Sequence, residues 1–132
     1  MAIKVVSRET LPKKEKKGQG KQVLHDSNES HVWIHGPNDP GDKGPMHKHT
    51  ADEIFVCITG EATFEFPDRP AEVLKPGMMI IIPKGDFYQV TASGKGEMNL
   101  FGMRSEPFEK PRFSTEEEVV SDNNRFKAGA TY

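Results

Sequence analysis

A short stretch of the chain carries three side chains of the kinds that bind metal ions. His47 and His49 are separated by one residue, and Glu53 follows four positions after His49. Side chains two apart in a β-strand project to the same face, so both imidazoles would point in one direction. Two imidazoles and one carboxylate are the ligand set of non-haem Fe(II) sites, and they also suit Mn, Ni, Co and Zn. The three residues therefore predict a site for one divalent metal ion, whereas the two histidines alone would more readily indicate an exposed loop.

These side chains need strands to position them, and the surrounding sequence has the pattern of short β-strands. Turn-forming Gly, Pro, Asn and Asp residues separate apolar segments between residues 21 and 104, which is typical of an all-β sandwich or barrel. After this region, Ser114 and Glu117 resemble a capping box and predict a short C-terminal helical turn. The expected strands are 21–25, 30–36, 45–50, 53–59, 62–66, 71–74, 78–82, 87–91 and 97–104.

The metal-ligand triplet is part of a longer pattern of spaced residues. The first segment begins with Gly41 and, after five residues, has His47-Lys48-His49. Glu53 follows after three more residues and Gly60 after a further six. Sixteen residues later the second segment has Gly77, five residues and then Pro83-Lys84-Gly85. The two segments resemble the two motifs of the cupin superfamily, tightly over residues 41–92 and loosely over 21–104. This resemblance implies a small antiparallel β-barrel of the jelly-roll, or double-stranded β-helix, type.

The resemblance also divides the chain. We expect the cupin barrel over residues 21–104, preceded by an N-terminal strand and a Lys-rich loop in residues 1–20. Residues 105–132 would form a C-terminal extension. The Lys-rich loop has no apolar residue between 13 and 20, so we expect it to lie in solvent.

One position departs from the family pattern. Family members carry a histidine three positions after the Pro-x-Gly segment, where it supplies a fourth metal ligand; this chain has Tyr88 there. Three interpretations remain open for Tyr88. In the first, Tyr88 is a phenolate ligand, which requires the metal to lower a phenol pKa of about 10. In the second, it stays protonated beside a three-ligand metal as a hydrogen-bond donor or acid/base group. In the third, its ring is simply packed, with the hydroxyl group hydrogen-bonded. A three-ligand metal would leave a position open for a substrate or O₂.

Alternation along the strands indicates which side chains surround the site. Cys57 is expected to be a small interior residue rather than a nucleophile, because no basic neighbour in the sequence lowers its pKa. Trp33 is a candidate wall of the cavity, while His35 either lies at the rim or supports the metal ligands. Arg69 and Arg104 could bind a substrate carboxylate, although the pattern singles out neither. Carrying the inward direction of Glu53 forward assigns three residues to the interior: Phe55, Cys57 and Thr59.

Composition excludes several classes of protein. The 132 residues include 18 basic and 20 acidic ones, so no strong net charge attracts nucleic acid. The longest apolar run, residues 78–82, is far shorter than the roughly twenty residues of a membrane span. The polar start predicts no secretory signal, and the single Cys57 can form no intramolecular disulfide. We therefore expect a cytoplasmic protein without a nucleic-acid or membrane partner.

The leading hypothesis is a cupin metalloenzyme that acts on a small polar molecule. His47, His49 and Glu53 would hold the divalent metal, with Tyr88 at its edge, for a metal-dependent, dioxygenase-like oxidation. Since the superfamily also contains isomerases and lyases, an alternative uses Tyr88 as an acid/base group, and a second alternative is a non-catalytic protein that binds a small ligand. Residues 53–59 and 78–82 are apolar on both faces, so a homodimer is expected to cover the outer face.

Overall fold

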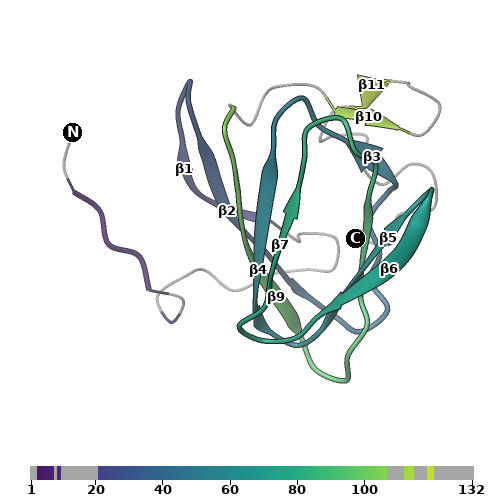
Figure 1. Cartoon of the computed structure of the whole chain (residues 1–132). Helices are drawn as coiled ribbons and strands as arrows, with labels where there is room; N and C mark the ends of the chain where they lie inside the picture. The colour runs from purple at the N-terminus through teal and green to yellow at the C-terminus, as the bar shows by residue number, and fades with distance from the viewer. Residues whose placement is uncertain (1–2, 8, 10–20, 107–111, 115–118, 121–132) are drawn as a thin grey trace.

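Two antiparallel β-sheets face each other and enclose the apolar side chains (Figure 1). The structure is a computed structural model that describes residues 3–7, 9, 21–106, 112–114 and 119–120. One sheet has the strand order β1-β2-β9-β4-β7, the second has the order β6-β5-β8, and a small third sheet has the order β11-β10-β3. The strands are β1 Lys21–Asp26, β2 His31–Asn38, β3 His47–Lys48, β4 Glu53–Thr59, β5 Ala62–Phe66, β6 Arg69–Leu74, β7 Met79–Ile82, β8 Gln89–Ala92, β9 Met98–Arg104, β10 Arg112–Ser114 and β11 Val119–Val120.

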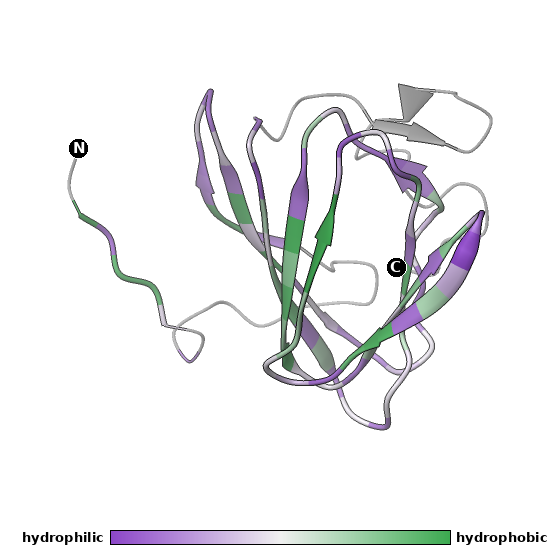
Figure 2. Ribbon diagram, viewed as in Figure 1, coloured by the Kyte–Doolittle hydropathy of each residue, from purple (hydrophilic) through white to green (hydrophobic). Residues whose placement is uncertain are grey.

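Burial alternates along β4, which lies between β9 and β7 in the five-stranded sheet. Phe55 and Cys57 are 2% and 1% exposed, while Ile54, Val56 and Ile58 are half-buried on the outer face. Figure 2 shows hydrophobic residues along β4 and its neighbour β7. The expected alternation ends at Thr59, because the register with β9 shifts between Cys57 and Thr59, and the Thr59 hydroxyl donates to the Glu97 carbonyl.

The core joins the two large sheets. Phe55 of β4 contacts Phe64 of β5, with ring centroids 5.5 Å apart, and it meets the Trp33 ring of β2 edge-on at 5.6 Å. Gly102 of β9 makes room for this indole, since a Cβ at position 102 would lie 2.5 Å from an indole carbon. A side chain at this position would therefore push Trp33 into an interior that is already filled.

The glycines of the spaced pattern have a common structural reason. Gly41, Gly60, Gly77 and Gly85 all adopt positive φ angles, from 73° to 94°, a region that L side chains rarely occupy. They lie in connections between strands. The pattern seen in the sequence is thus a pattern of turns.

Most of the expected strands are confirmed, but the strand expected at 45–50 is reduced to His47–Lys48, so His49 lies just beyond its end. Residues 53–59 and 62–66 form strands with the expected bounds. The expected turn at 67–70 is shorter because Phe66 pairs with Arg69, which leaves a two-residue hairpin loop. Strand 87–91 begins instead at Gln89.

The C-terminal part of the chain contributes a strand beside the predicted metal ligands. Phe113 and Ser114 of β10 pair with Lys48 and His47 of β3. The expected helical turn falls on residues 115–118, which lie outside the described residues, as do residues 10–20 of the Lys-rich region.

No helix in the described part of the chain is long and apolar enough to span a membrane.

Candidate metal centre

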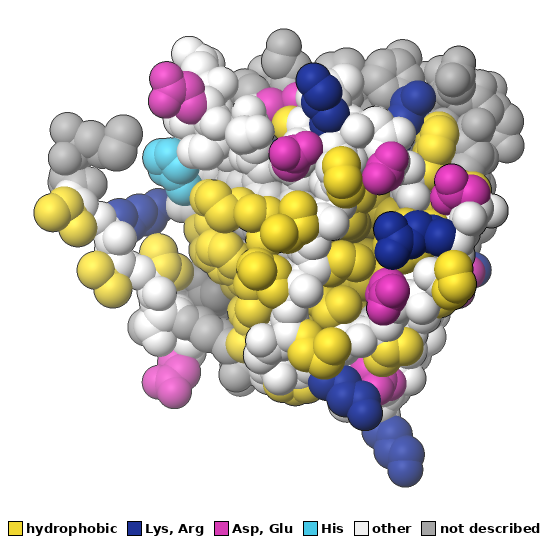
Figure 3. All heavy atoms as spheres, viewed as in Figure 1, with side chains coloured by type: hydrophobic (Ala, Val, Ile, Leu, Met, Phe, Trp, Pro, Cys, Tyr) yellow, Lys and Arg dark blue, Asp and Glu magenta, His cyan; other side chains and the backbone are white. Residues whose placement is uncertain are grey.

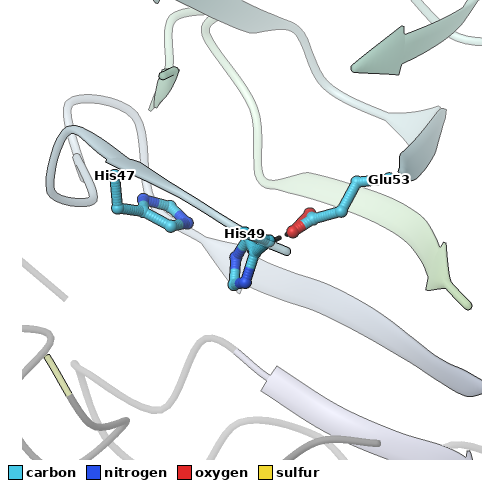
Figure 4. A group of neighbouring side chains, drawn as sticks. All are labelled: His47, His49 and Glu53. Atoms are coloured by element: carbon cyan, nitrogen blue, oxygen red, sulfur yellow. Dashed lines mark ion pairs between the residues drawn. The ribbon is translucent and has the colours of Figure 1, made fainter. Parts of the chain in front are cut away.

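The short strand β3, the residue directly after it and the start of β4 bring the three predicted ligands together. His47, His49 and Glu53 each offer a donor atom, and these atoms all lie within 4.8 Å of one another. Figure 4 shows the three side chains converging on a common point. All three are buried, with exposures of 6%, 6% and 1%. The sequence-based grouping of these residues therefore matches their arrangement in space.

Backbone contacts orient the ring of His47. Its Nδ1 lies 2.8 Å from the Pro45 carbonyl oxygen, which can only accept a hydrogen bond, so Nδ1 carries the ring proton. The lone pair is then on Nε2, as in a histidine prepared to bind a metal ion. Tyr88 packs on this imidazole, with ring centroids 4.6 Å apart.

His49 and Glu53 form the closest contact of the site. His49 Nε2 lies 2.7 Å from Glu53 Oε1. Burial by itself raises the pKa of Glu53, but interactions with His49, His47 and Arg104, including a hydrogen bond from His49, outweigh it and lower the pKa to about 2. Glu53 is therefore an anion at neutral pH.

Tyr88 reaches the site from the position just before β8, a strand of the β6-β5-β8 sheet. It pairs with His47 through an isolated bridge in which each residue's N–H donates to the carbonyl of the other. Its side chain is 3% exposed, and its hydroxyl donates to the Glu53 carboxylate, 2.7 Å from Oε2 and 3.1 Å from Oε1. The hydroxyl is thus held against one of the predicted ligands.

A buried arginine completes the surroundings of the three donors. Arg104 lies opposite Glu53 in the β4–β9 register, and its Nη1 is 3.7 Å from Glu53 Oε1 and 3.3 Å from His49 Nδ1. Its Nε is 3.8 Å from Glu106, whose other oxygen accepts from the Thr50 hydroxyl at 2.5 Å. The sequence pointed to Arg104 only as one of two arginines, although it continues the alternation of inward-facing positions along β9.

Other residues considered from the sequence lie away from the donors. His35 packs beside Phe55 at 6.2 Å between ring centroids, and it is not among the grouped ligands. Arg69 is exposed and pairs with Glu72 at 3.9 Å. Cys57 is buried, and burial together with the charge of Glu61 raises the pKa of its thiol, so the expectation of an inert interior residue agrees with its surroundings.

The donor set fits a divalent metal ion. Two imidazoles and one ionised carboxylate supply nitrogen and oxygen ligands from buried positions, and one of the imidazoles already has its second ring nitrogen bonded to the backbone. Such sets bind Fe, Mn, Ni, Co and Zn. The three residues leave further coordination positions to other molecules.

The family assignment comes from sequence comparison. Residues 38–102 match the family model described as Cupin domain. The chain belongs to the cupin superfamily. Among curated relatives, it is 30% identical to auxin-binding protein 1 of Arabidopsis thaliana over 93 residues, 64% of this chain and 46% of the relative. Auxin-binding protein T92 of Nicotiana tabacum is 32% identical over 84 residues, 57% of this chain and 44% of the relative. This cupin chain thus matches less than half the length of those relatives.

Solved structures confirm the fold of this cupin. A double-stranded β-helix protein from Klebsiella pneumoniae superposes with a TM-score of 0.67 at 18% identity, covering 91% of this chain and 99% of that one. A cupin superfamily protein from Desulfitobacterium hafniense has a TM-score of 0.61 at 17% identity, covering 70% of this chain and 83% of that one. DMSP lyase DddQ from Ruegeria pomeroyi also has a TM-score of 0.61 at 17% identity, covering 86% of this chain and 61% of that one. The predicted jelly-roll barrel is therefore confirmed, while identities this low concern the fold alone.

Proposed function

We propose that this cupin is a mononuclear metalloenzyme that acts on a small polar molecule. His47, His49 and Glu53 would hold one divalent ion, either Fe, Mn, Ni, Co or Zn. The observation that carries the proposal is the convergence of three buried donor atoms within 4.8 Å. A bound ion would supply Lewis-acid chemistry, and an iron ion would also supply redox chemistry with O₂.

The leading reaction is a metal-dependent oxidation, because two histidines and one carboxylate with open positions are typical of non-haem iron oxygenases. The chain's own part is to bind and orient the reactants. Glu53 stays ionised, and the buried rings of Phe55, Trp33 and Tyr88 keep water away from the inner side of the site.

A second reaction class is supported by the hydrogen bond from Tyr88 to Glu53. The distance of 2.7 Å to Oε2 favours a protonated phenol held beside the three donors, the second of the three interpretations. From this position Tyr88 could give a proton to a bound substrate or take one from it, as an isomerase or lyase requires. The fold likeness to DMSP lyase is compatible with this chemistry.

A non-catalytic role is the remaining candidate. The curated relatives at 30–32% identity are auxin-binding proteins, named for a small ligand that they bind. In such a role the metal would anchor an anionic ligand, and the same three residues would be needed for affinity rather than for turnover.

Metal analysis of untagged protein, purified without chelators, tests the proposal. We expect one equivalent of a divalent metal in the wild type and its loss in His47→Ala. His25→Ala is the matched control, since His25 is a half-buried histidine of β1 outside the ligand group, and it should retain the metal. A wild-type protein that binds no divalent metal, even when it is offered in excess, would refute the proposal.

The identity of the metal and the phenotype of His47→Ala then separate the candidates. Iron would favour oxidation, and a redox-inactive metal would favour the isomerase or lyase. Loss of turnover in a folded His47→Ala variant supports an enzyme, whereas a change confined to ligand affinity supports the binding role.

A further inference from the structure

A buried arginine stands directly behind the predicted metal ligands. Figure 3 shows lysine and arginine side chains at the surface, interspersed with acidic ones on the face in view. Arg104 differs from them, because it is 4% exposed. Among the residues whose burial the structure describes, no other lysine or arginine is buried. Since removing a cation from water is costly, a buried arginine needs partners of opposite charge.

Strand pairing fixes where the Arg104 side chain lies. Arg104 is the last residue of β9, opposite Glu53 in the register with β4 and opposite His31 in the register with β2. Its guanidinium lies over the Trp33 ring, 5.6 Å from the ring centroid. Gly102, two residues earlier in β9, leaves room for this ring. The guanidinium is therefore held on the inner side of the sheet, beside the metal ligands.

The guanidinium contacts two of the three ligands at one end and is anchored at the other. Its Nη1 lies 3.7 Å from Glu53 Oε1 and 3.3 Å from His49 Nδ1. Its Nε lies 3.8 Å from Oε1 of Glu106, which is 7% exposed. The other oxygen of Glu106 accepts a hydrogen bond from the Thr50 hydroxyl, in the connection between β3 and β4. Arg104 thus links two ligands to a buried carboxylate that is itself held in place.

These contacts favour a role toward the ligands over a role toward a substrate. An arginine that binds a substrate carboxylate directs its N–H groups into an accessible cavity, whereas Arg104 is buried against groups of its own chain. Two carboxylates, those of Glu53 and Glu106, already offset its charge. The guanidinium is therefore arranged to act through Glu53 and His49.

We propose that Arg104 is a positioning residue of the metal centre, which holds Glu53 and His49 in the arrangement that binds the ion. The inference rests on the proposed metal site at His47, His49 and Glu53. Groups that contact metal ligands from behind fix the orientation of those ligands, and their loss typically lowers metal affinity about 10–100-fold. The guanidinium charge by itself repels a cation, so a role confined to charge predicts the opposite change, a gain of affinity when Arg104 is removed.

Cobalt binding to full-length protein, stripped of metal with a chelator, tests the inference. Isothermal titration calorimetry gives the affinity for Co²⁺, and the visible absorption of bound Co²⁺ reports its coordination. We expect the dissociation constant of Arg104→Met to rise about 10–100-fold, with a changed absorption spectrum. Arg69→Met is the matched control and should bind Co²⁺ as the wild type does. Arg69 also lies over an aromatic ring, that of Phe66 at 5.1 Å, and pairs with a glutamate, but it is exposed.

Two further variants separate positioning from charge. Arg104→Lys keeps the charge without the planar fork of N–H groups, so it should bind Co²⁺ more weakly than the wild type and more tightly than Arg104→Met. Glu106→Gln keeps Arg104 but removes the charge of its anchor, so it should also weaken binding, by less than Arg104→Met. These two variants carry the test if Arg104→Met does not fold, which circular dichroism checks.

The outcomes that overturn this inference differ from those that overturn the proposed function. A wild type that binds no divalent metal overturns both. Co²⁺ binding that Arg104→Met leaves unchanged or strengthens overturns the inference and leaves the metal site in place. Wild-type affinity in both Arg104→Lys and Glu106→Gln has the same consequence. A lowered unfolding midpoint of Arg104→Met, with the Co²⁺ affinity and spectrum of the wild type, would make Arg104 a structural residue only.

Discussion

Replacement of Tyr88 by phenylalanine isolates the hydroxyl that lies against Glu53. The substitution removes the donor 2.7 Å from Glu53 Oε2 and leaves the ring in place against His47, Phe55 and Phe64, whose centroids lie 4.6, 5.9 and 6.1 Å from it. No atom is added, so no clash is created. The change in stability therefore reports the hydrogen bond rather than the packing.

The magnitude follows from the charge and burial of the acceptor. Glu53 is 1% exposed, and its pKa of about 2 makes it an anion at pH 7. A hydrogen bond to a charged group contributes about 1.5–3 kcal/mol, and the single hydroxyl proton counts once although it lies near both oxygens. We expect the free energy of unfolding of Tyr88→Phe to fall by this amount.

Urea denaturation in the presence of a chelator, at pH 7, measures the difference without a contribution from metal binding. Thr63→Val is the control, since the Thr63 hydroxyl also donates at 2.7 Å, but to the neutral Ser93 hydroxyl at an exposed position. We expect Thr63→Val to change the free energy of unfolding by no more than about 0.5 kcal/mol.

An effect of Tyr88→Phe as small as that of Thr63→Val would refute the reasoning and leave Tyr88 as a packed ring. Loss of the metal in Tyr88→Phe, to the extent seen in His47→Ala, would instead identify the phenolate as a ligand. The proposed hydrogen-bond donor predicts that the metal is retained.

Three further predictions concern the core, the thiol and the metal. Gly102→Ala should lower the free energy of unfolding by about 1–3 kcal/mol, because its Cβ would lie 2.5 Å from the Trp33 indole; Gly96→Ala, which meets nothing within 4 Å, should not, and equal urea midpoints would contradict this. Cys57 should react with iodoacetamide far more slowly in native than in unfolded protein at pH 8, because its thiol is 1% exposed and its pKa is raised; equal rates would show an accessible thiolate. A divalent metal at one hundred times its dissociation constant should raise the free energy of unfolding by about 2.7 kcal/mol in the wild type and not in His47→Ala, and equal gains would place the metal elsewhere.

Strand alternation and turn chemistry are local properties, and they account for most of what was correctly predicted. The bounds of β4 and β5 follow from alternation and from the glycine between them, Gly60, whose φ of 73° ends one strand before the next begins. The turn at 67–70 was predicted too long because composition marks a turn region, whereas pairing between Phe66 and Arg69 decides its ends.

The surroundings of the metal ligands could be predicted only in part, since they depend on contacts between distant residues. Tyr88 and Glu53 are 35 positions apart, and Arg104 and His49 are 55 apart. Alternation places Arg104 on the inner face, but only the register of β9 against β4 brings it opposite Glu53. A shift of one residue in that register would turn Arg104 to the other face.

The sequence by itself determined the residue types, the close spacing of His47, His49 and Glu53, and the turns that separate the strands, because each depends on a few neighbouring residues. The tertiary structure alone decided which atom the Tyr88 hydroxyl bonds, that the C-terminal strand β10 lies beside β3, and that Arg104 lies opposite Glu53. These features depend on strand register and on how the sheets close, and many distant contacts set both together.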